Sequence, residues 1–433
     1  MERKIITKEK VVELLLSYSA DPTKTNEDGL TSLLIVTQAS FKNDGMMQLL
    51  LEGIKNSPLI YQNLELNTED RNGDTALHHA LANGDWEMAK LLMKNGADPD
   101  TFNKVGATPL HVISRNDICT KLEEFFRLVD ANYEVKVRVN ARDANGNSPL
   151  HFAISRDHRP TIELLLSRKA DPNVANAAGS TPLHLICDES RDENLARFYL
   201  KICEKNHKSV HMNKKDSQGR TPLQLAVKNL QPELCQLLMD YIPDKNLDNF
   251  SFPSEYRDIR PVFEATRLEA AANLLWILEI LASRKCEPTL DNAMAMLGFL
   301  NDHGLFYQGH QRAIEELRQL PEDDSFVVRA QKTELIPGQS LWDLLRLRPG
   351  QQQQVIKYSY YSRIARTWEL GNLPRLQQRA CFAHMHELML RDFCSKWAAK
   401  SHAAMFDHKL IVDDDFSNEN LYDICTAREK ITR

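Results

Sequence analysis

The chain has 433 residues, enough for two or three domains, and 42% of them are hydrophobic, as in globular proteins. Its formal net charge of −6 argues against a general binder of nucleic acid or membrane surfaces. No long apolar run follows the charged first ten residues, and the most apolar stretch, 270–282, is too short to cross a bilayer. The eight cysteines form no C-x-x-C pair, so we expect reduced thiols and a cytoplasmic chain, with the nucleus as the alternative.

Residues 1–25 are predicted to form half of a helical repeat. The apolar residues at 11, 12, 14, 15 and 16 make the face of one helix, and Ala20-Asp21-Pro22 follows as its exit. The helix that should precede this one is missing. Either residues 1–10 cap this end, or Met1 lies inside a longer array.

A tetrapeptide close to Thr-Pro-Leu-His recurs six times, and a glycine stands two residues before each copy. Glycine suits a turn position with positive φ, Thr or Ser suits a helix N-cap, and Pro suits the first helical position. Each copy therefore predicts a tight turn followed at once by a helix. The copies begin at Thr31, Thr75, Thr108, Ser148, Thr181 and Thr221.

The spacing of these copies alternates between short and long. The short interval, from 75 to 108 and from 148 to 181, is 33 residues, which is the ankyrin period. The chain therefore resembles the ankyrin-repeat family, which implies an α-solenoid with β-turn fingers. The long intervals place extra residues near 130–136 and 204–210, after the second helix. We expect either an exposed ridge beside the binding edge or slack loops there.

The repeat pattern stops after residue 247. We assign 26–247 to six repeats, 248–254 to a linker and 255–433 to a helical tail. Helices are expected at 268–282, 292–300, 341–345, 376–399 and 416–428, with a loop at 320–327. The fold class is therefore all-α: an ankyrin solenoid followed by a helical C-terminal domain.

The tail resembles the PRANC domain, which follows ankyrin repeats in proteins of poxviruses and parasitoid wasps. The resemblance rests on Ala-Ala-Asn-Leu at 271–274, Ser-Leu-Trp-Asp-Leu-Leu at 340–345 and an F-box-like end at about 405–433. It implies that this end contacts Skp and cullin subunits of a ubiquitin ligase. The contact residues would be Leu410, Ile411, Phe416, Leu421 and Ile424. The sequence His408-Lys409-Leu410-Ile411 stands where an F-box usually opens with Leu-Pro.

No enzyme motif was found, since the chain has no P-loop, no G-x-S-x-G and no kinase loops, and we expect no cofactor. The histidines of the repeated tetrapeptide are predicted to be hydrogen-bonding core residues. No metal site is expected, because Cys381, His384, His386 and Cys394 point in different directions around one helix. The basic, tyrosine-containing segment 346–379 suggests a solvated helix face more than a nucleic-acid site.

We predict a protein-binding chain whose turn tips and first-helix faces contact an unidentified protein partner. Two functions fit this prediction: an adaptor presenting that partner to a cullin-type ubiquitin ligase, and a scaffold or sequestering inhibitor without a ligase. A degenerate enzyme within 255–433 is a remote third. The predicted tip residues are Arg71, Asn72, Asp74, Lys104, Val105, Ala144, Asn145, Asn147, Ala177, Ser180, Ser217, Gln218 and Arg220.

Overall fold

The computed structural model describes residues 8–18, 20–38, 44–55, 66–116, 119–131, 136–189, 193–243, 247, 250–256, 264–303, 311–347, 356–367, 370 and 373–406. The chain divides into two compact units, residues 1–222 and 223–433, and each is described by itself.

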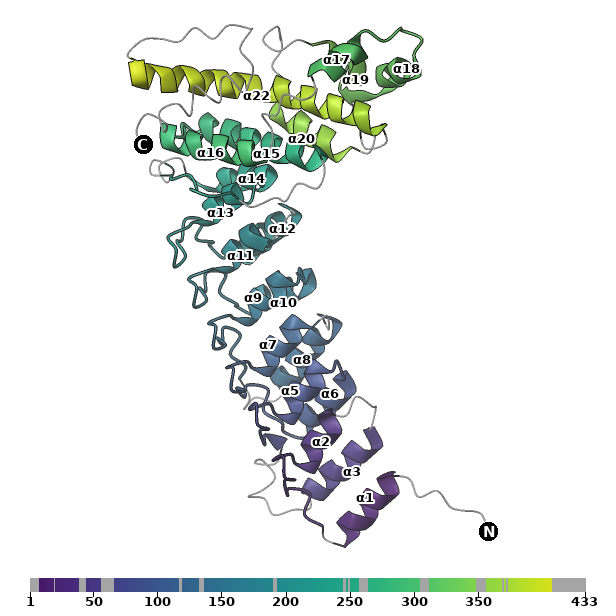
Figure 1. Ribbon diagram of the computed structural model, residues 1–433. Coiled ribbons are helices and arrows are strands. Elements are labelled where there is room, and N and C mark those ends of the chain that lie inside the picture. The colour runs from purple at the N-terminus through teal and green to yellow at the C-terminus, as the bar shows by residue number, and fades with distance from the viewer. Residues whose placement is uncertain are drawn as a thin grey trace. The chain divides into compact units, whose positions relative to one another are not determined.

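Helix pairs stack one on another in the N-terminal unit (Figure 1). The first helices of the pairs are α2 (Ser32–Gln38), α5 (Ala76–Ala82), α7 (Pro109–Arg115), α9 (Pro149–Ser155) and α11 (Pro182–Glu189). The second helices are α3 (Asp44–Lys55), α6 (Trp86–Lys94), α8 (Cys119–Ala131), α10 (Arg159–Ser167) and α12 (Glu193–Lys205). Each helix contacts its counterpart in the next pair, and the unpaired α1 (Lys8–Ser17) packs on α3. This is the predicted ankyrin solenoid, which α1 continues at its N-terminal end.

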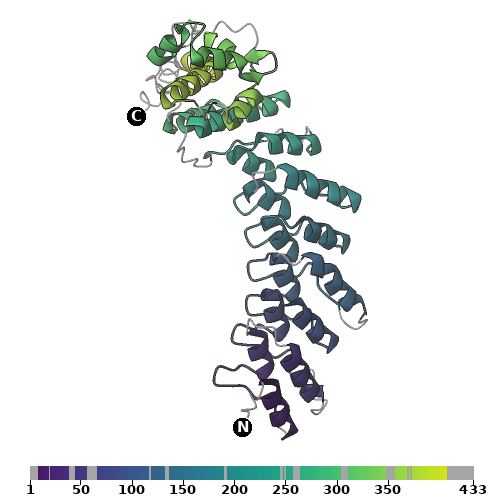
Figure 2. The same cartoon turned by 90° about the vertical axis from the view of Figure 1, so that its right-hand side faces the viewer.

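A tight turn, here called a finger, precedes each first helix. Figure 2 shows the fingers projecting on one side of the stack, beside the first helices and away from the second helices. The fingers are residues 26–30, 70–74, 103–107, 143–147, 176–180 and 216–220. In each one the first residue donates its backbone N–H to the carbonyl of the last, as from Asp70 to Asp74 at 3.0 Å.

The finger glycines are required for two physical reasons. Gly73 has φ +78 and Gly179 has φ +73, in the left-handed region that side chains disfavour. In addition, a Cβ on Gly73 would lie 2.6 Å from the backbone nitrogen of Lys104, and one on Gly179 would lie 2.6 Å from that of Ser217. At Gly73 and Gly179 the next finger therefore approaches too closely for any side chain.

The leucines of the repeated motif form the centre of the stack. Leu77, Leu110, Leu150 and Leu183 are at most 1% exposed, and so is Leu165 of the second helix α10. Each repeat thus buries its apolar faces against its neighbours, as expected for a solenoid. None of the six cysteines whose side chains the structure describes, Cys187 among them, forms a disulfide.

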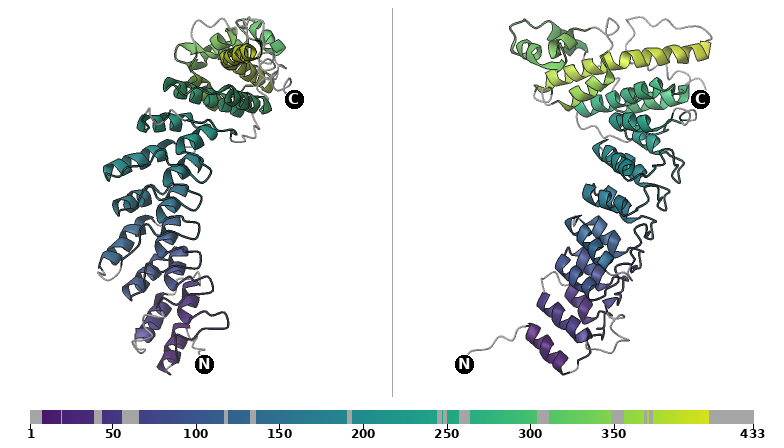
Figure 3. Two further views of the ribbon diagram at one scale, coloured as in Figure 1. Left: turned by 90° about the vertical axis from the view of Figure 1, so that its left-hand side faces the viewer. Right: turned by 180° about the vertical axis from the view of Figure 1, so that it is seen from behind.

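The extra residues of the third and fifth repeats lengthen their second helices. Helices α8 and α12 have 13 residues each, whereas α6 and α10 have 9. The longer helices extend on the side opposite the fingers (Figure 3, left). The predicted extended ridge at the binding edge is therefore wrong for the part described, because the added residues continue a helix by about one turn. Residues 132–135 lie outside the described chain.

The C-terminal unit begins with the sixth helix pair, α13 (Pro222–Lys228) and α14 (Pro232–Tyr241). This division falls one pair before the predicted linker, because α14 packs against α15. A buried bond from Asn273 Nδ2 on α15 to the Leu230 carbonyl (3.1 Å) supports that packing. The remaining helices are α15 (Glu264–Ser283), α16 (Leu290–Asp302), α17 (Gln311–Arg318), α18 (Ser325–Lys332), α19 (Leu341–Arg346), α20 (Tyr358–Arg366) and α22 (Arg375–Phe406).

The long helix α22 contacts α15, α16, α17 and α20 and is the main support of this unit (Figure 3, right). Two features differ from the expectation. Helix α18 begins inside the loop predicted at 320–327, and the strands β1 (Glu334–Ile336) and β2 (Gln339–Ser340) form a small antiparallel hairpin. Ser340 caps α19 as predicted, accepting the Asp343 N–H at 3.2 Å. No described helix is long and apolar enough to cross a membrane.

Candidate protein-binding surface

The histidine of each Thr-Pro-Leu-His copy joins its own repeat to the next one. In the repeat anchored at Ser148, His151 Nδ1 accepts the Ser148 backbone N–H at 3.1 Å and faces its hydroxyl at 2.9 Å. The other ring nitrogen, Nε2, lies 3.1 Å from the Ser180 carbonyl of the following finger. His78, His111 and His184 make the same contacts in their repeats. The prediction of hydrogen-bonding core histidines is therefore confirmed.

These contacts hold the four rings neutral. A carbonyl can only accept, so Nε2 must carry the proton and Nδ1 must be the acceptor. Each ring is at most 2% exposed. Burial lowers the pKa of all four, and it lowers that of His151 to about 4. The fingers are thus fixed to the stack by neutral hydrogen bonds.

An Asn or Asp begins every finger and shapes it, a feature that the sequence analysis missed. Asn176 Oδ1 accepts the backbone N–H groups of Ala178 and Ser180, both at 3.0 Å. Asp70 and Asp216 do the same in their fingers. The signal was present, because all six fingers begin with Asn or Asp, five residues before the anchor.

A backbone ladder connects the second to the sixth finger. Lys104 N–H donates to the Asn72 carbonyl at 2.9 Å, and Ala144 N–H donates to that of Val105 at 2.8 Å. The next two steps are Ala177 to Asn145 at 2.8 Å and Ser217 to Ala178 at 2.9 Å. Residues at the tips are therefore presented on a continuous, hydrogen-bonded edge.

The predicted tip residues divide into two groups by exposure. Nine are exposed on the fingers: Arg71, Asn72, Lys104, Val105, Ala144, Asn145, Ala177, Ser217 and Gln218. Four are half-buried and directly precede the anchors: Asp74, Asn147, Ser180 and Arg220. Some side chains of the second group make contacts within the array. Asp74 accepts a hydrogen bond from Asn103 at 2.7 Å, and Arg220 forms an ion pair with Asp216 at 2.7 Å.

The first helices lie beside the fingers (Figure 2). Their last residues include Ala82, Arg115 and Ser155, all exposed. One position later, Asn83 Nδ2 donates to the Thr37 carbonyl at 2.9 Å, and Asn116 Nδ2 donates to the Leu81 carbonyl at 2.9 Å. These asparagines satisfy the last carbonyls of the preceding first helix. Sequence reasoning expected first-helix faces but did not identify these residues.

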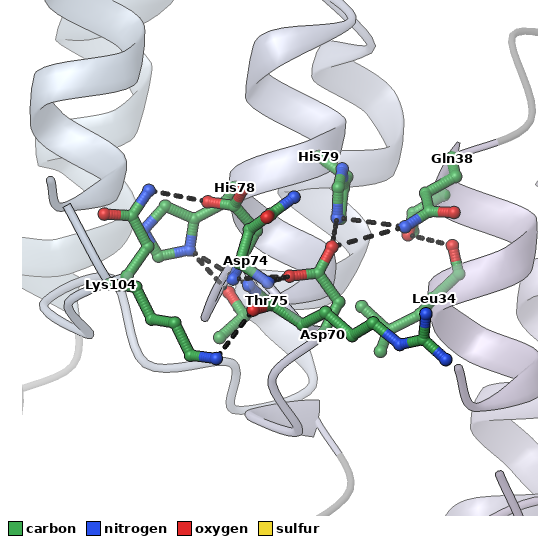
Figure 4. Close-up of polar contacts among 12 residues, drawn as sticks. Leu34, Gln38, Asp70, Asp74, Thr75, His78, His79 and Lys104 are labelled. Carbon is green, nitrogen blue, oxygen red and sulfur yellow. Dashed lines mark hydrogen bonds and ion pairs between the residues drawn. The ribbon is translucent and has the colours of Figure 1, made fainter. Parts of the chain in front are cut away.

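A polar cluster lies between the first and second repeats (Figure 4). His79 Nε2 is 3.0 Å from Asp70 Oδ2, and Gln38 Nε2 lies 3.3 Å from the same ring nitrogen. Burial acts to raise the Asp70 pKa, but the N–H groups of Asp74 and Asn72 together with His79 lower it overall. Asp70, Asp74 and His79 could reach one ion, yet the hydrogen bonds above already account for their positions.

Among the described residues no other group of three or more His, Cys, Asp or Glu side chains comes as close together. The four residues weighed for metal binding do not form such a group: His384 Nε2 instead bonds the Leu344 carbonyl at 3.1 Å. Burial, with a contribution from Arg318, lowers the His384 pKa to about 4. The F-box-like residues Leu410, Ile411, Phe416, Leu421 and Ile424 lie outside the described chain.

The basic segment of the tail supports packing within its own unit. Tyr361 is buried, whereas Arg363 and Arg366 are exposed on the other side of α20. Arg366 pairs with Glu269 at 2.8 Å and with Glu233 at 3.2 Å. This arrangement is the solvated basic face over an aromatic core.

Comparison with known families places ankyrin repeats over most of the N-terminal half. A model described as ankyrin repeats (3 copies) matches residues 5–103 and 169–249. A second, described as ankyrin repeats (many copies), matches residues 131–186. The matched residues include five of the six predicted anchors.

Relatives from an animal and from two viruses are similar to part of this chain. The chain is 28% identical over 180 residues to the transient receptor potential cation channel subfamily A member 1 of Homo sapiens, covering 40% of the chain and 15% of the channel. It is 28% identical over 248 residues to an ankyrin repeat protein of Acanthamoeba polyphaga mimivirus, covering 50% and 29% respectively. A Fowlpox virus ankyrin repeat protein is 28% identical over 163 residues, covering 36% and 44%. The chain thus spans less than half of each of these relatives.

Proposed function

The chain is an ankyrin-repeat protein, a protein–protein interaction module, and we propose that it binds its partner through the fingers and the ends of the first helices. The observation that carries the proposal is the finger ladder with its nine exposed tip residues. Hydrogen bonds hold the backbone of these tips before any partner arrives. Binding of a partner therefore costs little conformational entropy for ordering this surface.

The tail is the basis of a second part of the proposal. Its resemblance to PRANC supports an adaptor role, in which the array holds a protein and the F-box-like end recruits Skp and cullin subunits of a ubiquitin ligase. The helix order of the C-terminal unit agrees with that resemblance, since α15 carries residues 271–274 and Ser340 caps α19. A scaffold or sequestering inhibitor without a ligase is the alternative.

Affinity purification with two full-length variants and one shortened chain tests both parts. The first variant replaces the exposed tips Arg71, Lys104, Asn145 and Gln218 by alanine, and the shortened chain ends at residue 406, after α22. The second variant replaces Arg127 and Lys201 on α8 and α12 and serves as the control for the array.

The adaptor proposal expects the tip variant to lose the array partner and to retain ligase subunits. The shortened chain should show the reverse, and the control should retain both. If the tip variant keeps its partner, the binding surface lies elsewhere. If no ligase subunit is recovered with any full-length chain, the scaffold alternative holds.

A further inference from the structure

Four cations on the fingers and first-helix ends of the third and fourth repeats have no carboxylate partner among the described residues. Lys104 and Arg142 belong to the fingers or their bases, whereas Arg115 ends α7 and Arg156 caps the end of α9. All four are exposed. No Asp or Glu that the structure describes lies within 4.0 Å of any of them, although the chain carries a net charge of −6.

Other arginines of the array have such partners. Arg71 pairs with Asp28 at 3.4 Å, and Arg168 pairs with Asp130 at 2.8 Å. Two described acids that lie next to Arg142 and Arg156 in sequence are already engaged. Asp143 accepts the Asn147 N–H at 2.7 Å, and Asp157 pairs with Arg159 at 3.2 Å. No described carboxylate therefore pairs directly with these four cations.

Neutral acceptors hold two of these cations in place. The Lys104 ammonium donates to the Arg71 carbonyl at 2.7 Å. The Arg142 guanidinium donates to the carbonyls of Ala175 at 2.7 Å and Gly146 at 3.2 Å. These carbonyls fix the position of the charges but do not cancel them. Such a surface is prepared for anionic groups before a partner binds.

We propose that Lys104, Arg115, Arg142 and Arg156 together bind an extended acidic segment of the protein partner. Packed helices such as α7 and α9 lie about 8–10 Å apart. An extended segment of the polyproline type advances about 9 Å in three residues and returns its side chains to the same side. Acidic side chains three residues apart would therefore meet the arginines of successive repeats. This inference rests on the proposed protein-binding function.

A nucleic acid is the other polyanion that such charges could attract. Single-stranded nucleic acids are bound by basic grooves with exposed aromatic rings on which bases stack. Phe152 on the first helix α9 is half-buried, and its ring packs edge-to-face with that of His111 at a centroid distance of 5.9 Å. The surface therefore favours carboxylates on a protein chain.

Fluorescence anisotropy with the full-length protein tests the proposal. The probe is a fluorescein-labelled peptide with four Glu-Pro-Pro units, and the control probe has four Gln-Pro-Pro units. We expect binding of the glutamate probe in 50 mM salt and at least tenfold weaker binding of the glutamine probe. Arg115→Gln combined with Arg156→Gln should weaken binding of the glutamate probe at least tenfold.

The matched control is Arg127→Gln combined with Lys201→Gln, which removes the same charge from exposed positions on the second helices α8 and α12. It should change the affinity less than twofold, and thermal unfolding of both variants should match the parent chain, because the residues are exposed. Equal losses in the two variants would show a general charge effect and overturn the proposal.

Two further results would also overturn it. One is tighter binding of a 12-residue thymidine oligonucleotide than of the glutamate probe. The other is absence of binding by the parent chain. Neither result would refute the proposed function, which fails only if the four-tip variant keeps its partner in the affinity purification.

Discussion

Replacing His151 by glutamine should change how the stability of the array depends on pH. In the folded chain His151 is neutral, with Nδ1 accepting from Ser148 and Nε2 donating to the Ser180 carbonyl. The sixth repeat shows that glutamine can replace this link. Gln224, at the same position, donates to the Ser251 carbonyl at 2.8 Å.

The size of this pH effect follows from the difference between the folded and unfolded pKa of His151. Burial lowers the folded-state pKa of His151 to about 4, whereas an unfolded histidine has a pKa of about 6.5. The unfolded chain therefore binds a proton between these values that the folded chain excludes, so stability is complete above about pH 6.5 and falls as the pH approaches 4. Each pH unit in this window costs at most about 1.4 kcal/mol, which gives about 2 kcal/mol for His151 between pH 7 and pH 4.5.

Urea denaturation followed by circular dichroism, at pH 7, 6, 5 and 4.5, measures the effect. His151→Gln should cost about 1 kcal/mol at pH 7, because the glutamine replaces the paired ring imperfectly. Glutamine does not titrate in this range. Between pH 7 and pH 4.5 the free energy of unfolding of the variant should therefore fall by about 2 kcal/mol less than that of the parent chain. The variant should therefore become the more stable protein near pH 4.5.

The control is His211→Gln, whose side chain is exposed and outside the repeated tetrapeptide. It should leave the pH dependence of the parent chain unchanged. Parallel stability curves for the parent chain and His151→Gln would refute the reasoning, since they would mean that folding does not exclude a proton at this ring.

Three further substitutions probe the packing. Leu165→Ala removes a fully buried side chain on α10 and should cost about 2–5 kcal/mol in chemical denaturation; a change below about 0.5 kcal/mol would mean that the repeat register is wrong. Gly179→Ala should destabilise the array more than Gly219→Ala, because both have positive φ, worth about 1–2 kcal/mol, but only the added Cβ at 179 meets a backbone atom, at 2.6 Å; equal losses in thermal unfolding would contradict this. Asn273→Ala should cost about 2–3 kcal/mol by urea titration, because it leaves the buried Ser362 hydroxyl and the Leu230 carbonyl without their partner; a neutral result would refute the bridging role.

Local rules made the array predictable. Glycine, Pro and the Thr or Ser cap act within a few residues, so the anchors located the starts of the first helices, as at Pro109 and Pro149. The role of the histidines as hydrogen-bonding core residues could also be predicted, because four similar sites along a stack are typical of a structural role and not of a catalytic one. The Asn or Asp that begins each finger obeys an equally local rule and could have been predicted.

The missed features depend on contacts between distant residues. Nothing local indicates that Asn83 and Asn116 reach the carbonyls of the preceding first helix. For the extra residues of the third and fifth repeats the sequence left two expectations, an exposed ridge and slack loops. In the structure α8 and α12 instead absorb part of them, which helical stacking makes favourable. In the tail, periodicity located α15, α16 and α22, but α18 is short and rich in β-branched residues.

The surface chemistry was predictable only in part. The tips could be placed from their distance to the turn glycines, and nine of them are exposed. Whether a cation is paired depends on neighbours far away in sequence. Arg71 meets Asp28 of the preceding finger, whereas Arg115 and Arg156 meet no carboxylate that the structure describes. The cationic group of the third and fourth repeats therefore became visible only in three dimensions.

The central claim, that a protein partner docks on the fingers, is tested most directly by photo-crosslinking in cells that produce the chain. A photoreactive phenylalanine is placed singly at Asn145, on a finger, or at Lys201, on the second helix α12. We predict one discrete crosslinked protein from position 145, lost when Arg71, Lys104 and Gln218 are also replaced, and none from position 201. Crosslinking from position 201 without crosslinking from 145 would contradict the account and place the partner on the second helices.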